Sequence, residues 1–164
     1  MKNSGISAYH GNLYNDQTYS LQADRDGCYR EDLLFVCRCS AKANDELLFL
    51  RSLLFRNTKL NSNAWQVLCV RSNKKTPILR WNMTQLIESY IVELARTNGR
   101  YRKEIILIAH AIECYLFLTA PDRREYENID QLRRRSLQMI SFMAKRIRFR
   151  QKREMLRSKC ASAA

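Results

Sequence analysis

The residues IILIAHAIECYLFL, from Ile105 to Leu118, form the longest apolar run of this 164-residue chain. The run contains His110 and Glu113, and it is shorter than the roughly 20 apolar residues that a transmembrane helix needs. Pro121 follows closely and predicts that a helix ends there. Because a helix that is apolar on nearly all sides is buried in the core of its domain, we expect a buried helix here and no transmembrane segment.

Two stretches before this run have the pattern of helices that pack against such a core. Asn44 is expected to cap a helix over residues 45–55, which has acids in its first turn. Its side chains are apolar on nearly all sides, so we expect it to be a central core helix. Asn82 and Gln85 resemble a capping box, and apolar residues follow them at helical spacing until Asn98-Gly99. The sequence therefore predicts that the helix before Asn98-Gly99 and the helix over Ile105–Leu118 form a helical hairpin.

The start of the chain changes character near residue 28. Residues 1–27 are polar and show neither helical nor alternating periodicity, so we expect a flexible polar tail. Apolar residues in Tyr29–Cys39 then recur at helical spacing and predict the first helix. We assign residues 28–147 to one helical domain and residues 148–164 to a basic C-terminal arm that continues the last helix.

Four glycines and two prolines are too few for a protein built from many short strands and turns. The segment WQVLCV, Trp65–Val70, is ambiguous, because six apolar residues fit a buried strand as well as a helix. RSNKKTPILRW, Arg71–Trp81, is expected to form a basic loop broken by Pro77. We therefore predict an all-α fold, a single compact bundle of about five or six helices with a long basic C-terminal helix. A short strand near 65–70 stays open as an alternative.

The sequence offers no recognisable chemistry for catalysis. It has two histidines and neither a glycine-rich phosphate loop nor a nucleophile elbow. Six cysteines without a signal segment before them indicate a reduced, intracellular protein. His110 and Cys114 lie four residues apart, and Cys37 is close to Cys39, but no C-x-x-C pair is present. We expect neither a metal site nor a cofactor, and a protein that is not an enzyme.

Positive charge is concentrated at the C-terminal end of the chain. From Gln131 to Ala164, eleven lysines and arginines face one acid, Glu154, which gives a net charge of +10 out of the +13 of the whole chain. Cations that are crowded in this way repel one another and favour a polyanionic partner. This pattern predicts a nucleic acid as the partner.

The last helix, expected to begin at Asp122 or near Asp130, resolves into three lines when it is wound at 100° per residue. A core-facing stripe consists of Ile129, Leu132, Met139, Ile140, Met143 and Ile147. A basic line consists of Arg134, Lys145, Arg148, Lys152 and Lys159. A third line, at seven-residue spacing, consists of Phe142, Phe149 and Leu156. The core stripe stops after Ile147, because Arg150, Glu154 and Arg157 take its next positions.

We expect the helix beyond Ile147 to protrude or to fray as an arm that contacts backbone phosphates, with an affinity that falls steeply with salt. The residues assigned to this contact are Arg134, Lys145, Arg146, Arg148, Arg150, Lys152, Arg153, Arg157 and Lys159, with Lys74 and Lys75 of the basic loop. Phe142, Phe149 and Leu156 would stack on unpaired bases or form the seam of a dimer. RNA or a single strand is favoured over duplex DNA, because no helix offers side chains suited to the major groove.

Other interpretations stay open at this stage. A helix-turn-helix fits the spacing of Leu94, Gly99 and Ile105, but its second helix would present apolar residues to the groove, so a plain helical hairpin is preferred. The main alternative function is a helical assembly module whose basic helix docks on an acidic protein or on its own twin. An anionic membrane surface is disfavoured, because cations surround the arm. KRIRFRQKR, Lys145–Arg153, would direct nuclear import in a eukaryotic host. Regulatory, ribonucleoprotein and packaging roles all fit.

Overall fold

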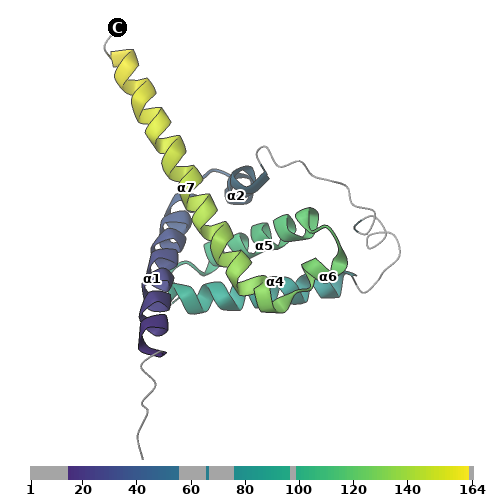
Figure 1. Ribbon diagram of the computed structural model, residues 1–164. Helices are drawn as coiled ribbons and strands as arrows, with labels where there is room; N and C mark the ends of the chain where they lie inside the picture. The colour runs from purple at the N-terminus through teal and green to yellow at the C-terminus, as the bar shows by residue number, and fades with distance from the viewer. Residues whose placement is uncertain (1–14, 56–65, 67–75, 97–98, 163–164) are drawn as a thin grey trace, which may run out of the picture.

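The computed structural model describes residues 15–55, 66, 76–96 and 99–162, and most of these residues lie in helices (Figure 1). The helices are α1 (Asn15–Ser40), α2 (Glu46–Phe55), α4 (Thr76–Ala95), α5 (Arg102–Thr119), α6 (Arg123–Tyr126) and α7 (Ile129–Ser162). None of the described residues lies in a strand. The prediction of a compact all-α bundle with a long basic C-terminal helix is therefore confirmed. Of the ambiguous segment Trp65–Val70, only Gln66 lies among the described residues, and it is helical.

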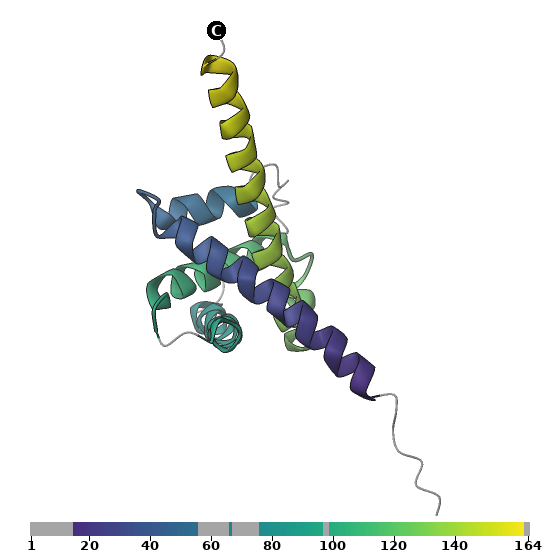
Figure 2. The same ribbon diagram turned by 90° about the vertical axis from the view of Figure 1, so that its left-hand side faces the viewer.

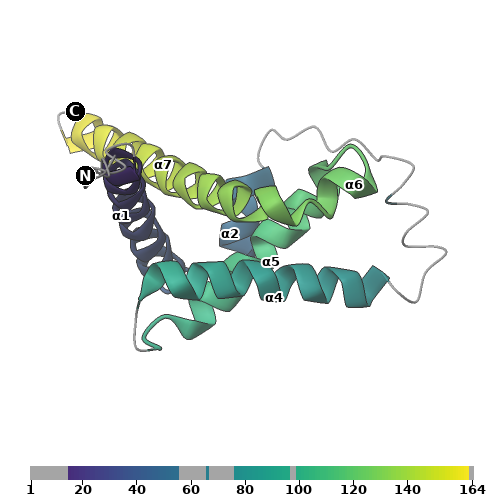
Figure 3. The ribbon, with the colours of Figure 1, turned by 60° about the horizontal axis from the view of Figure 1, so that its bottom comes forward.

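The centre of the bundle is α5, which contains the long apolar run. It packs against α4 and α2 and also contacts α1 (Figure 3). Its fully or almost fully buried apolar side chains are Ile105, Ile108, Ala109, Ala111, Ile112, Leu116 and Phe117. Arg80 near the start of α4 bonds to Glu113 in the second half of α5, so the two helices form an antiparallel hairpin. The expectation of a buried helix over this run is confirmed, and α5, not the helix over residues 45–55, lies at the centre of the bundle.

The first helix is longer than its apolar pattern predicted. It begins at Asn15, within the segment 1–27 that was expected to be a flexible tail, and not at Tyr29. Apolar periodicity reports a buried face and not helix formation itself, and residues 15–26 include good helix formers such as Leu21, Gln22 and Ala23. Residues 1–14 lie outside the described part of the chain.

The second helix begins one residue later than expected, and its cap differs. The backbone N–H of Leu48 donates a 2.8 Å hydrogen bond to Oδ1 of Asp45, so Asp45 and not Asn44 is the cap. Leu50, Leu53 and Leu54 are buried, whereas Leu48 is exposed. The helix therefore covers one side of the core and does not lie at its centre.

The fourth helix begins earlier than the sequence indicated. It starts at Thr76, so Pro77 lies in its first turn and not in a loop. Proline is tolerated there, because the first N–H groups of a helix have no intrahelical partner. Asn82, expected as a cap, lies inside the helix, and Trp81 is 61% exposed and does not enter the core.

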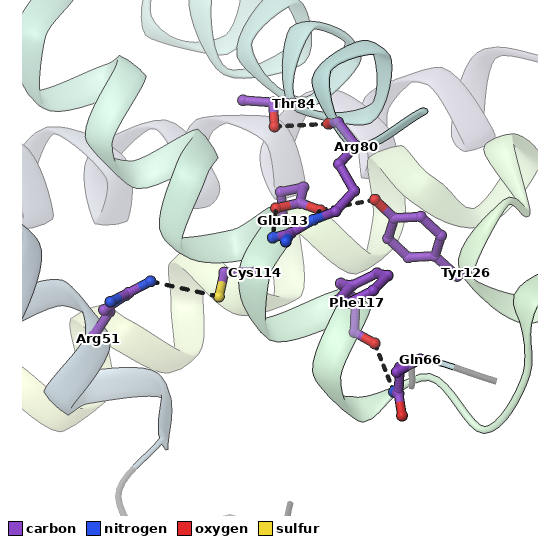
Figure 4. Close-up of polar contacts among 8 residues, drawn as sticks. All are labelled: Arg51, Gln66, Arg80, Thr84, Glu113, Cys114, Phe117 and Tyr126. Carbon is purple, nitrogen blue, oxygen red and sulfur yellow. Dashed lines mark hydrogen bonds and ion pairs between the residues drawn. The ribbon is translucent and has the colours of Figure 1, made fainter. Parts of the chain in front are cut away.

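A buried carboxylate joins α4, α5 and α6 (Figure 4). Glu113, with 1% of its side chain exposed, accepts hydrogen bonds from Nε and a terminal nitrogen of Arg80, each at 2.7 Å, and from the hydroxyl of Tyr126 at 2.8 Å. The Arg80 guanidinium also lies 4.4 Å from the ring centroid of Phe117. Burial, together with the Glu113 charge, raises the pKa of Tyr126, so its hydroxyl remains a donor. We call these four residues the Glu113 cluster.

The sequence left two possible starting points for a single last helix. The structure has two helices in this region, α6 and α7. Asp122 caps the short α6, since its Oδ1 accepts a 2.7 Å hydrogen bond from the N–H of Glu125. At the start of α7, Oδ1 of Asn128 accepts a 3.3 Å hydrogen bond from the N–H of Gln131. Both expected starts, near Asp122 and near Asp130, therefore mark a helix.

The Glu113 cluster predicts a large stability difference between two carboxylates. Replacing Glu113 by alanine leaves the Arg80 guanidinium and the Tyr126 hydroxyl without their buried acceptor, so we expect a loss of about 3 kcal/mol in the free energy of unfolding. The matched control is Glu93→Ala, which removes the exposed 3.5 Å pair with Arg133 and should cost less than about 1 kcal/mol. Urea unfolding followed by circular dichroism measures both. Equal losses would contradict a structural role for the cluster.

Candidate nucleic-acid interface

The long helix α7 consists of an inner half that packs on the body and an outer half that does not. The inner half contacts α1, α2 and α4, and its buried residues are Leu132, Ser136, Leu137, Ile140, Met143, Ala144 and Ile147. The outer half projects beyond the bundle (Figures 1 and 2), and every residue from Gln151 to Ala161 is exposed. The predicted end of the core stripe at Ile147 is confirmed, and the helix continues to Ser162. Two members of the stripe differ from expectation, because Ile129 is 52% exposed and Met139 is only partly buried.

Two arginines at the boundary between these halves bind the C-terminal end of α2. A terminal nitrogen of Arg146 donates a 2.6 Å hydrogen bond to the carbonyl oxygen of Leu53. Arg150 donates to the carbonyl oxygen and to the hydroxyl of Ser52, each at 3.2 Å. The last carbonyls of a helix have no intrahelical donor and lie at the negative end of its dipole. Because α2 has no basic residue in its own last turn, α7 supplies the cations that cap it.

A third arginine ties α7 to α1. A terminal nitrogen of Arg148 donates a 2.7 Å hydrogen bond to Oδ1 of Asp32, whose side chain is almost fully buried. Its guanidinium lies 4.9 Å from the ring centroid of Phe35 on the same helix. Arg146, Arg148 and Arg150 were all assigned to phosphate contact by sequence, and in the structure each has a partner in the body.

The remaining assigned cations of α7 are exposed. They are Arg134, Lys145, Lys152, Arg153, Arg157 and Lys159. Arg134 lies on the inner half, where it donates a 3.4 Å hydrogen bond to Gln131. The last four lie on the outer half, where the only described acid is Glu154. We call residues 151–162 the outer arm. Lys74 and Lys75 lie outside the described residues, so the structure does not connect the basic loop with this surface.

The line of Phe142, Phe149 and Leu156 follows α7 from the body onto the outer arm. Phe149 and Leu156 are 62% and 54% exposed, and Phe142 is partly buried at the junction. The guanidinium of Arg146 lies 4.4 Å from the Phe142 ring centroid, and that of Arg153 lies 5.8 Å from the Phe149 ring centroid. Each of the two rings of this line therefore lies beside an arginine.

The sequence contains a signal for this arrangement that the three-line description missed. Phe142, Lys145 and Arg146 recur seven residues later as Phe149, Lys152 and Arg153, in the pattern F-x-x-K-R. Residues three and four positions after a ring lie on the same face of a helix as that ring. Each repeat thus places one lysine and one arginine beside an aromatic side chain. We call the two repeats the first and second F-x-x-K-R units.

A metal site finds no support in the described part of the chain. No group of three or more His, Cys, Asp or Glu side chains there could hold a metal ion. Burial raises the pKa of the Cys37 thiol to about 12, which disfavours the thiolate that a metal would need. No described helix combines the length and the apolar character that crossing a bilayer requires.

No family model, curated protein or solved structure matches this chain. Its function therefore has to be argued from the chemistry of α7 and of the elements that hold it.

The contact of Arg146 with the end of α2 predicts that Arg146 and Arg157, both on α7, contribute different amounts to the free energy of unfolding. Arg146→Ala removes a charged donor from the Leu53 carbonyl and from the Phe142 ring, so we expect the free energy of unfolding to fall by about 2 kcal/mol. Arg157→Ala, on the exposed outer arm, is the matched control and should change it by less than about 0.5 kcal/mol. Chemical denaturation measures the difference. A larger loss for Arg157→Ala would contradict the division of α7 into two halves.

Proposed function

We propose that this protein is a non-enzymatic nucleic-acid-binding protein whose outer arm contacts backbone phosphates. One observation carries the proposal: Lys152, Arg153, Arg157 and Lys159 all lie exposed on a stretch of helix that has left the core. A basic helix that buries no apolar face contributes little to the fold, and a polyanion relieves the repulsion among its cations. A regulatory, ribonucleoprotein or packaging role follows from the same contact.

RNA or a single strand is the preferred ligand within this proposal. The helix that a helix-turn-helix would use for reading DNA is α5, and its groove-facing positions would include Ile106 and Leu107, which are apolar and partly buried. Side chains of this kind cannot form hydrogen bonds to the base edges that duplex DNA presents in its major groove. Exposed Phe149, in contrast, suits stacking on bases that are not paired.

Assembly through the outer arm is the second candidate, because Met155 and Leu156 are exposed on it and Phe149 is exposed directly before it. In a coiled coil, Phe149 and Leu156 would occupy one core position of each heptad, and the other would fall to Lys152 and Lys159 or to Arg153 and Cys160. Layers of like charge oppose such a seam. Nucleic acid is therefore the better partner, and an acidic protein surface is the competing one.

The segment Lys145–Arg153 is also proposed to direct nuclear import if the host is eukaryotic. Lys145, Lys152 and Arg153 are exposed and accessible to a receptor, although Arg146, Arg148 and Arg150 are engaged with the body. This role would accompany nucleic-acid binding and would not replace it.

The proposal predicts a salt dependence that the outer arm controls. We expect the affinity for a fluorescein-labelled single strand to fall linearly on a log–log plot against salt. Each phosphate contact adds about 0.7 to the slope, so four arm cations account for up to about three units. The test variant replaces Lys152, Arg153, Arg157 and Lys159 by glutamine, which retains helix propensity. Fluorescence anisotropy across a salt series measures the change in slope.

Two matched chains sharpen this experiment. A chain that ends at Gln151 lacks all but the first residue of the outer arm and keeps the contacts of Arg146, Arg148 and Arg150, so it should lose the same part of the slope. A control variant neutralises the same number of cations on the body by glutamine, at Arg38, Lys42, Arg102 and Arg124, and should keep most of the slope. Salt-insensitive self-association that nucleic acid does not affect would refute the proposal in favour of assembly.

A further inference from the structure

A groove lies where α1 crosses the inner half of α7, directly before the outer arm begins. It has a volume of about 340 Å³, and its walls consist of Tyr29 from α1 and Gln138, Met139, Ser141, Phe142 and Lys145 from α7. Ligand clefts start at about 300 Å³, so the groove has room for a flat group of modest size. The groove belongs to the junction between α1 and α7. The two helices run in the same general direction there, because Asp32, which follows Tyr29 on α1, accepts a hydrogen bond from Arg148, which follows Lys145 on α7.

The lining of the groove combines aromatic and neutral polar side chains. Tyr29 and Phe142 contribute rings, and Met139 contributes a thioether, which contacts aromatic groups favourably. The amide of Gln138 and the hydroxyl of Ser141 form no hydrogen bond with any other described residue, so both can bond to a ligand. This set resembles what proteins use for an unpaired base, namely ring stacking together with hydrogen bonds to the edge of the base.

The charge around the groove also matches a nucleotide. Lys145 lies exposed at its rim, and none of the described residues that line it is an acid. On α1, Asp32 lies three residues after Tyr29, and its carboxylate is bonded to Arg148. Among the described lining residues, a phosphate attached to a bound base would therefore meet a cation and no carboxylate.

The groove is continuous with the outer arm through the two F-x-x-K-R units. Phe142 and Lys145, which line the groove, belong to the first unit, and Phe149 and Lys152 form the second. Seven residues of helix advance by about 10 Å, so the second ring lies two turns further along the same face. A strand that starts in the groove would find another ring and another pair of cations as it follows the helix outward.

From this geometry we infer that the groove between α1 and α7 binds one unpaired base of a single-stranded nucleic acid against Tyr29 and Phe142. Lys145 binds the adjoining phosphate, and the strand continues along the second unit. The inference rests on the proposed function, since it gives the outer arm a fixed point at which its ligand is anchored. A base within a duplex is stacked on both faces and cannot enter, so the groove selects single strands.

The test compares two groove variants with one control in the full-length chain. We expect Tyr29→Leu and Phe142→Leu each to lower the affinity for a single-stranded oligonucleotide roughly tenfold, because each removes stacking on a base. The salt slope should stay unchanged, since the phosphate contacts remain, and so should the affinity for a duplex of the same sequence. Tyr29→Phe keeps the ring and should bind like the unmodified chain. Trp81→Leu, which removes an exposed ring elsewhere on the body, should have no effect.

Photocrosslinking of the unmodified chain gives a second measurement that does not depend on variant stability. A single strand that contains 5-bromouracil should crosslink to the peptide with Tyr29 or to that with Phe142, as identified by mass spectrometry. RNA and DNA strands are tested in parallel, and either supports the inference. Crosslinks confined to other peptides would overturn it.

The outcomes separate this inference from the proposed function. A steep salt slope with equal affinity for single strands and duplexes, or with groove variants that bind normally, overturns the groove and leaves the outer arm as the interface. The absence of salt-dependent binding to any oligonucleotide overturns both.

Discussion

The fold depends on how the central helix buries a carboxylate. Most of α5 is apolar and enclosed, yet Glu113 lies on it with only 1% of its side chain exposed. An ionised carboxylate in such a place needs charged and hydrogen-bonding partners. Arg80 supplies two donors from α4 and Tyr126 supplies one from α6. Because α6 leads directly into α7, this requirement also fixes where the long helix begins and how it crosses the bundle.

The cations of α7 divide into two groups that differ in role. Arg146 and Arg150 cap α2, and Arg148 neutralises Asp32, so these three hold the long helix against two neighbours. The cations of the outer arm lie beyond the last buried residue, Ile147. The first group orients the helix, and the second is presented to solvent at a defined distance from the body. The proposed phosphate contact would benefit from this division, because the inner half of α7 is held by the body while the cations of the outer arm remain accessible.

Several features could be predicted from the sequence because they depend on local pattern. The apolar run Ile105–Leu118 indicated a buried helix, and the loss of apolar positions after Ile147 indicated where α7 leaves the core. The start of α1 at Asn15 was missed, because helix formation does not require a buried face that periodicity can reveal. The prediction of a loop over Arg71–Trp81 was wrong for residues 76–81, which belong to α4. Proline interrupts the interior of a helix but is favourable in its first turn, where Pro77 lies.

By itself the sequence determined the helical class, the burial of the helix over Ile105–Leu118 and the concentration of charge in the last helix, since composition and periodicity act along the chain. Only the tertiary structure decided which cations are engaged. Arg148 and Lys152 belong to the same line of α7, yet one meets Asp32 and the other meets solvent. The groove between Tyr29 and Phe142 is likewise a product of packing, because its walls come from helices more than one hundred residues apart in the chain. Contacts of this kind depend on where helices cross, and no pattern within a single helix encodes that position.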